Sequence, residues 1–106
     1  MNVTFPTALV LQALASGYHY GFDIIDATNL PGGTVYPALR RLEDERLVRS
    51  RWEKAAVAQR EGRPPRRYYE IQPAGETWLE AARERFRALE HAVARPRPLK
   101  PARAES

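Results

Sequence analysis

The chain has 106 residues, 43 % of them hydrophobic and 28 % charged, which is room for one domain of ordinary globular composition. It contains no cysteine, so disulfides and thiolate metal sites are excluded, and its two histidines, His19 and His91, stand alone; we expect neither a metal nor a cofactor. No apolar run reaches the roughly 20 residues of a membrane span, and no basic residue precedes Arg40 to start a signal peptide, so we expect a cytoplasmic protein without membrane contact.

The positive charge of the chain is concentrated in its middle. Residues 1–39 carry two acids and no base, residues 40–67 ten bases and five acids, residues 68–94 three bases and five acids, and residues 95–106 four bases and one acid. A basic block between acidic flanks is the pattern expected of a protein that binds a polyanion. On charge alone, a solvated cluster at the surface would look the same.

The first helix is predicted at residues 4–15, because this run consists of good helix formers and its proline falls in the first turn. Its apolar residues lie nearly all round the helix, so we expect burial on more than one side. These residues are Phe5, Ala8, Leu9, Leu11, Ala13 and Leu14. A short second helix is predicted at residues 21–28, followed by a compact turn over residues 29–33.

The third helix is predicted at residues 34–46. On a 3.6-residue period Val35, Leu39 and Leu42 share the buried face, and the opposite face is polar and basic. That opposite face carries Thr34, Pro37, Arg40, Arg41 and Asp44, with Tyr36 at its border. The two arginines are candidates for contact with a polyanion, although they could instead pair with acids of the same helix.

A hairpin with a long basic tip is predicted next. Residues 47–52 alternate between apolar and polar, which indicates a strand, and residues 68–71 form its partner. The intervening residues 53–66 are charged and are expected to be a flexible loop. Trp52 is expected to pack at the end of the first strand.

A last helix is predicted at residues 73–93, opened by a proline. Its apolar residues recur in steps of 3, 4, 3 and 4, which is the spacing of a coiled-coil seam. The seam consists of Leu79, Ala82, Phe86, Leu89 and Val93, and we expect it to form a homodimer together with Leu9 of the first helix. The alternative is an ordinary amphipathic helix packed on its own domain.

The order of elements is that of a winged helix-turn-helix: three helices, a strand, a basic wing, a strand and a final helix. The predicted fold is therefore mostly α with a two-stranded wing and a C-terminal dimerisation helix. Residues 1–72 would form the winged-helix DNA-binding domain, residues 73–94 the dimerisation helix, and residues 95–106 a disordered tail rich in proline and basic residues.

Three sequence blocks make the resemblance to a family specific. They are YGFDI at residues 20–24, GTVYPALRRLE at residues 33–43 and GRPPRRYY at residues 62–69. In this order they resemble the hallmark blocks of PadR-type regulators, over roughly residues 5–93. The resemblance implies a winged-helix DNA-binding domain with a C-terminal dimerisation helix, usually a repressor whose DNA affinity is controlled by a small molecule.

The resemblance also implies the residues that bind DNA. Thr34 and Tyr36 would donate hydroxyl hydrogen bonds to phosphates, and Arg40 or Arg41 would reach base edges or backbone. The full set is Thr34, Tyr36, Pro37, Arg40, Arg41, Arg63, Arg66, Arg67 and Tyr69. The chain departs from the family at Arg46, where a glycine usually caps the third helix.

A small aromatic effector is the other partner that the resemblance implies. Trp78 and Phe86 are the candidates to line its pocket at the dimer interface, and the alternative for both is a plain core role. His19 and His91 are expected to be incidental.

The expected function is sequence-specific binding of double-stranded DNA by a homodimeric repressor, whose half-sites would lie about 34 Å apart in a near-palindromic operator. The alternative is a winged-helix module that binds protein or RNA without reading DNA sequence. An enzyme is not expected, because the chain has no nucleophilic cysteine, no paired His and acid, and no Gly-rich phosphate loop.

Overall fold

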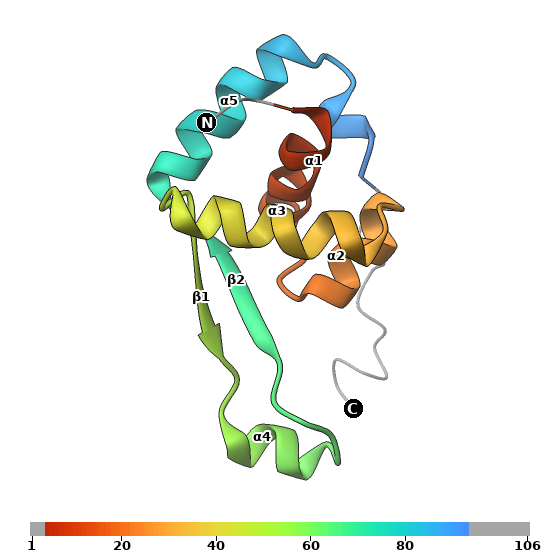
Figure 1. Ribbon diagram of the computed structural model, residues 1–106, viewed down its shortest axis with the longest axis vertical. Coiled ribbons are helices and arrows are strands. Elements are labelled where there is room, and N and C mark those ends of the chain that lie inside the picture. The colour runs from red at the N-terminus through yellow and green to blue at the C-terminus, as the bar shows by residue number, and fades with distance from the viewer. Residues whose placement is uncertain (1–3, 94–106) are drawn as a thin grey trace.

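Residues 4–93 are described by the structure, which is a computed structural model of the chain. Figure 1 shows helices gathered at one end and a two-stranded hairpin that projects away from them, with a short helix at its far end. The elements are α1 (Phe5–Ala15), α2 (Gly21–Thr28), α3 (Gly32–Asp44), β1 (Val48–Trp52), α4 (Ala55–Arg60), β2 (Arg67–Ile71), α5 (Pro73–Arg85) and the 3₁₀ turn η1 (Leu89–His91). The predicted mostly helical winged fold is confirmed.

Helix α1 is the centre of the core. Its residues 7–14 are all buried, and it contacts α2, α3, α5, η1 and β2. Thr4 caps its N-terminus by accepting the backbone N–H of Thr7, with Pro6 in the first turn. The prediction that this helix is buried on more than one side is confirmed.

Helix α3 ends in a complete Schellman motif. The backbone N–H of Leu47 donates to the Leu42 carbonyl at 2.9 Å, and that of Arg46 donates to the Glu43 carbonyl at 2.9 Å. This motif requires a left-handed residue, and Arg46 takes that conformation with φ of 63°. The predicted span 34–46 is therefore two residues too late at each end. As a result Pro37 lies inside the helix rather than in its first turn.

Replacing Arg46 with glycine is expected to stabilise the protein. A side chain in the left-handed region costs about 1 kcal/mol relative to glycine, so R46G should raise the free energy of unfolding by about that amount. The control is R46A, which removes the same charge but keeps a Cβ in the left-handed region, and it should give no gain. Thermal unfolding of the three proteins measures the difference; equal melting temperatures for R46G and R46A would contradict the capping argument.

Strands β1 and β2 pair antiparallel, with Val48 opposite Ile71 and Trp52 opposite Arg67. Both predicted strands are confirmed, and each starts within one residue of its predicted position. The loop between them was expected to be flexible over residues 53–66, and this is wrong in part because α4 forms there. Ala58 of α4 is 1 % exposed, so the short helix has an apolar side to bury.

The C-terminal helix is shorter than predicted. It ends at Arg85, and Phe86 leaves the helix with φ of −119° and ψ of 89°. The chain then turns through η1, which packs on α1 and buries Leu89 completely. A single helix over residues 73–93 is therefore wrong, and so is the continuous seam along it.

The residues of the predicted seam are used inside the chain itself. Their exposed fractions are 2 % for Leu79, 1 % for Ala82, 0 % for Leu89 and 7 % for Val93, and Leu9 of α1 is 4 % exposed. They belong to one hydrophobic core with α1 and α3. The physical reason is that α1 is mostly apolar and needs cover, and folding back onto it buries these side chains without a second chain.

The structure does not test the predicted domain boundary or the predicted tail. The division of the chain at residue 72 stays a prediction, and the tail at residues 95–106 lies outside the described residues. None of the helices within residues 4–93 has the length and apolar character needed to cross a membrane.

Candidate nucleic-acid interface

The recognition surface starts from the two faces of α3. Val35, Ala38, Leu39 and Leu42 are buried against the core, as the 3.6-residue period predicted for three of them. The opposite face is exposed and carries Tyr36, Pro37, Arg40, Arg41 and Asp44. Because residues four apart lie above one another on a helix, this face has two rows, one leading to the wing and the other to the start of α1.

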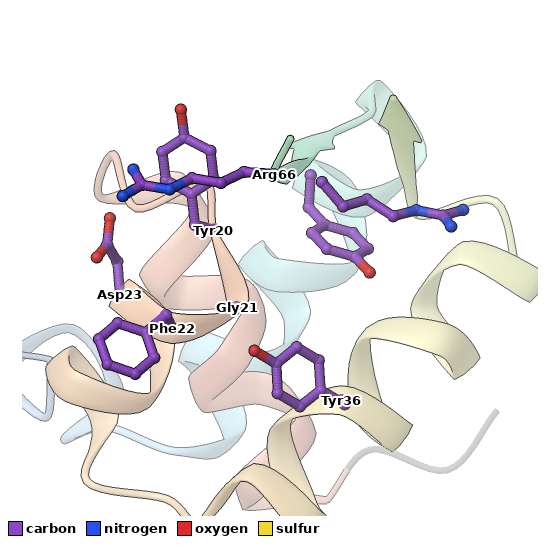
Figure 2. A pocket seen from close by; sticks show the side chains of 8 residues that line it. Tyr20, Gly21, Phe22, Asp23, Tyr36 and Arg66 are labelled. Atoms are coloured by element: carbon purple, nitrogen blue, oxygen red, sulfur yellow. The ribbon is translucent and has the colours of Figure 1, made fainter. Parts of the chain in front are cut away.

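The row that leads to the wing borders a pocket of about 280 Å³ between α2, α3 and β2. Four predicted residues meet there: Tyr36, Arg66, Arg67 and Tyr69. Figure 2 shows Tyr36 beside Gly21 at the start of α2, where any Cβ would overlap the phenol ring. Glycine at this position is what lets the tyrosine lie against α2.

The other row lies at the edge of this exposed face that is nearer to the start of α1. Thr34, Pro37 and Arg41 line a shallow hollow together with Thr4 and Pro6 of the α1 start. The structure therefore separates the predicted residues into two groups at the two edges of this face. Either row can contact a nucleic-acid backbone when the exposed face of α3 enters a groove.

Arg40 belongs to the row that leads to the wing. Its charge acts on Tyr69, whose pKa is raised above the ordinary value chiefly by burial and lowered in part by Arg67 and Arg40. Burial also raises the pKa of Tyr20. Both hydroxyls therefore stay protonated at neutral pH and are able to donate hydrogen bonds.

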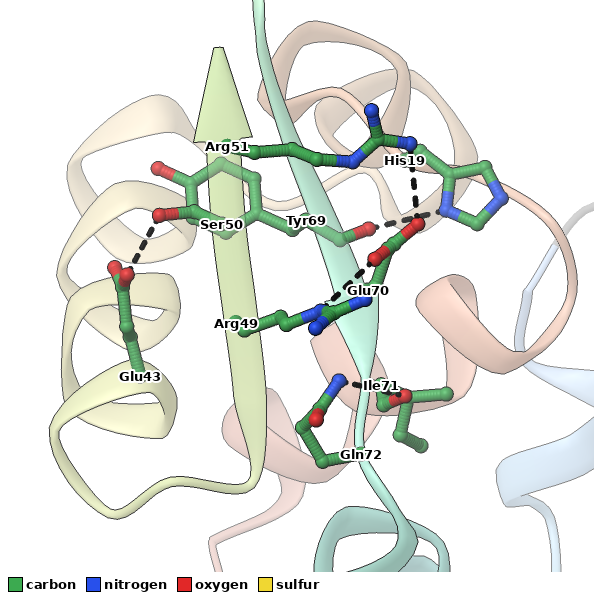
Figure 3. Close-up of polar contacts among 9 residues, drawn as sticks. All are labelled: His19, Glu43, Arg49, Ser50, Arg51, Tyr69, Glu70, Ile71 and Gln72. Carbon is green, nitrogen blue, oxygen red and sulfur yellow. Dashed lines mark hydrogen bonds and ion pairs between the residues drawn. The ribbon is translucent and has the colours of Figure 1, made fainter.

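Four of the ten basic residues in the block 40–67 form ion pairs. Figure 3 shows Arg49 and Arg51 both reaching Glu70 across the hairpin, at 3.2 and 3.3 Å. Arg63 binds Glu53 and Arg67 lies 3.7 Å from Glu43. Within the described part of the chain, no ion pair involves Arg40, Arg41, Arg46, Lys54, Arg60 or Arg66. These six are the cations left for a polyanion.

Arg63, one of the predicted DNA-binding residues, forms an ion pair within the wing. Its guanidinium donates to both carboxylate oxygens of Glu53, at 2.6 and 2.9 Å, and Glu53 also accepts the Arg66 backbone N–H at 3.2 Å. The Glu53 side chain is only 4 % exposed. Arg63 therefore holds the far end of the hairpin together, and its binding to DNA stays a prediction. The two residues lie ten apart in a stretch that the sequence indicated as a flexible loop, so no periodicity signalled the pair.

Because of this ion pair, we expect the pKa of the Glu53 carboxyl to be low. The Arg63 hydrogen bonds lower the pKa of Glu53 from 4.5 to about 2. A carboxyl whose pKa is lower in the folded state contributes stability above its ordinary pKa and loses it as the pH falls. The Glu53–Arg63 ion pair should therefore contribute its full stability above pH 4.5 and lose it as the pH falls toward about 2. An NMR titration of the Glu53 carboxyl carbon measures this; the R63Q variant should return the midpoint toward 4.5. Equal midpoints in both proteins would contradict it.

Several residues of this surface were missed by sequence reasoning. Tyr20 and Phe22 line the pocket, and Arg66 lies across the Tyr20 ring at 4.9 Å, as Figure 2 shows. Trp52 was expected to pack at the strand end, which is wrong because it is 61 % exposed. YGFDI at residues 20–24 was noted only as part of the family resemblance, and no signal in it marks two aromatic rings as pocket residues.

The predicted effector residues lie elsewhere. Phe86 packs edge-on against Phe5, with ring centroids 5.3 Å apart, and Trp78 is half-buried against the same core. Neither lines the pocket at α3. An effector site at these two residues stays a prediction. No cluster of three or more His, Asp or Glu that could bind a metal occurs in residues 4–93.

Comparison with known proteins decides the family. Residues 10–81 match the model of the transcriptional regulator PadR-like family, which is more than half of the chain. The chain belongs to the PadR-like family. A search of curated proteins gives no significant match.

Solved structures agree with this PadR-like assignment. A PadR family transcription regulator from hypervirulent Clostridium difficile R20291 is 26 % identical, with 83 % of this chain and 93 % of that chain covered and a TM-score of 0.68. A PadR-like transcription factor from Bacteroides fragilis is 26 % identical, with coverages of 80 % and 82 % and a TM-score of 0.64. The circadian clock associated protein Pex from Anabaena is 27 % identical, with coverages of 84 % and 79 % and a TM-score of 0.57.

Proposed function

We propose that this PadR-like regulator is a transcriptional repressor that binds a specific double-stranded DNA site in the cytoplasm as a homodimer. The observation that carries the proposal is the outer face of α3. It is exposed along its length, and Arg40 and Arg41 on it form no ion pair with residues 4–93. A helix of this kind fits the major groove, where arginine recognises guanine and reaches phosphates.

The start of α2 supports a backbone contact beside that helix. Tyr20 is its N-cap and provides no side-chain cap, so the first N–H groups of the helix keep their capacity to bind an anion. Gly21, Phe22 and Asp23 of this first turn line the same pocket as Arg66. A DNA phosphate placed there would meet amide groups, a guanidinium and tyrosine hydroxyls, while Asp23 would disfavour it in part.

The predicted seam is buried within one chain, so it does not support a homodimer. The homodimer is proposed because of how such proteins read DNA. One winged helix contacts few base pairs, and two copies related by a twofold axis would read two half-sites about one DNA turn apart. Release by a small aromatic effector is the remaining part of the proposal. The copy number is measured by light scattering of the full chain with and without its DNA.

The alternative is an interaction module that binds protein or RNA. Such a module would present an apolar outer face on α3, whereas this face is polar and basic. Selection of bound duplexes from a random pool at about 0.15 M salt distinguishes the two, because non-specific phosphate binding is weakened there. An enriched inverted repeat supports the dimeric repressor. Retention of duplexes without any common sequence favours the interaction module.

A further inference from the structure

Trp52 is a large apolar side chain that folding leaves in water. It is 61 % exposed at the end of β1. Alternation along the strand places it on the same sheet face as Val48 and Ser50. Ser50 on that face donates to the Glu43 carboxylate of α3 at 2.6 Å, as Figure 3 shows. Trp52 therefore lies on the side of the wing that looks toward the recognition helix.

The exposed Trp52 ring is contacted by the side chain of its cross-strand neighbour. Its cross-strand partner is Arg67, whose guanidinium carbon lies 5.3 Å from the ring centroid. Arg67 in turn donates to Ser50 at 2.9 Å and lies 3.7 Å from Glu43. These contacts link the ring to α3 through one arginine. Such a contact reduces the rotamer freedom that the ring would lose when a partner covers it.

The charges around Trp52 define the partner that fits. Lys54 and Arg66 lie next to the strand ends, are exposed, and form no ion pair with other described residues. The acid between Trp52 and Lys54 is Glu53, which is turned inward and bound by Arg63. The Arg66 guanidinium lies over the Tyr20 ring, and Lys54 follows Trp52 by two residues. An exposed apolar ring in a segment that carries these cations suits a sugar–phosphate backbone, whose sugars can pack on the ring while its phosphates meet the cations.

We propose that Trp52 packs against the DNA backbone beside the site read by α3, and that Arg67 is a positioning residue for the ring. The inference rests on the proposed DNA-binding function and assigns a contact to the far end of the β1–β2 hairpin. Trp52 would act without charge, so it should add affinity but not salt dependence. Arg66 and Lys54 would add both.

Two single-tryptophan proteins test the inference directly, because the chain has only two tryptophans. W78F leaves Trp52 as the sole emitter, and W52F leaves the half-buried Trp78 of α5. Each is titrated with an end-labelled duplex from the enriched pool, with label anisotropy and tryptophan emission recorded in the same samples. DNA binding should change the emission of W78F and leave that of W52F constant.

Affinity and salt dependence provide the second measurement. W52A should weaken duplex binding about tenfold, W52F should weaken it less, and neither should change the slope of log affinity against log salt. K54A and R66A should each reduce that slope by about 0.9. The R67A variant should weaken binding and also broaden the Trp52 emission of the W78F protein, because the ring then loses its contact with Arg67.

The outcomes separate the two proposals. Anisotropy that reports tight binding, together with constant Trp52 emission and full affinity in W52A, overturns the role of Trp52 and leaves DNA binding standing. A change of oligomeric state in W52A with unchanged DNA affinity overturns it too, because the ring would then contact a second copy. Absence of binding by every variant, with native circular dichroism, overturns the DNA-binding function itself.

Discussion

Replacing Arg40 with alanine is expected to weaken binding to the selected duplex by about 10- to 100-fold, since one good arginine contact to a base pair discriminates by about 1–3 kcal/mol. Arg40 lies on the exposed face of α3 and forms no ion pair in residues 4–93. Its loss should leave the fold intact, because an exposed side chain without partners contributes little to stability. Fluorescence anisotropy with labelled duplex measures the affinity, and thermal unfolding checks the fold.

The matched control for Arg40 is Arg49. It is also an exposed arginine, with a side chain 68 % exposed, but it pairs with Glu70 on the sheet face away from α3. R49A removes the same charge and should reduce affinity only slightly. R41A tests the second row of α3 and should also weaken binding. Equal affinities for R40A, R41A and the native protein would refute the placement of the recognition face.

Replacing Gly75 with alanine is expected to lower the free energy of unfolding by about 3 kcal/mol, near the upper end for overpacking. Gly75 is buried in the first turn of α5, and a Cβ there would overlap the Leu47 carbonyl oxygen and lie 2.9 Å from Cγ1 of Ile71. The Leu47 carbonyl cannot yield easily because it accepts the Gln72 backbone N–H at 2.9 Å. For a domain of this size the melting temperature should fall by about 15 °C.

Gly33 provides the control for Gly75. It also lies in the first turn of a helix, α3, and a Cβ there would meet nothing within 4 Å. G33A should leave the stability unchanged or raise it by up to about 1 kcal/mol, because alanine is the better helix former. Denaturant unfolding of both variants gives the comparison. A G75A protein as stable as G33A would show that α5 does not pack on the hairpin base as described.

Local patterns were sufficient to predict most of the fold. The all-round apolar first helix, the one-sided third helix and the alternating strands each have one good physical solution, and they were found with boundaries within two residues. Arg46 is instructive here: the sequence showed that a glycine was missing, and the structure shows that the arginine takes the left-handed position itself. The cap geometry is kept even where its preferred residue is absent.

The C-terminal segment shows where periodicity stops being decisive. The spacing of Leu79, Ala82, Phe86, Leu89 and Val93 indicates only that these side chains need burial. The spacing does not distinguish burial against a second copy from burial against α1 of the same chain. In the structure these side chains pack on α1, because the helix ends before Phe86 and the chain turns back. No glycine or proline at this position indicates that the helix ends there.

The candidate site was predictable in its residue types and less so in their partners. The exposed face of α3 follows from its period, so Tyr36, Pro37, Arg40 and Arg41 were placed correctly at the surface. The wing was harder because ion pairs join residues far apart in sequence, such as Arg67 with Glu43. Counting arginines therefore overstated the free positive charge of the wing.

The affinity of the full chain for the enriched duplex, compared with a scrambled duplex of the same composition at about 0.15 M salt, tests the central claim most directly. We predict a preference of at least about 1,000-fold, which is the lower end for specific DNA-binding proteins. The R40A variant should lose most of that preference. Equal affinities for the two duplexes, both falling steeply with salt, would contradict sequence-specific recognition by α3.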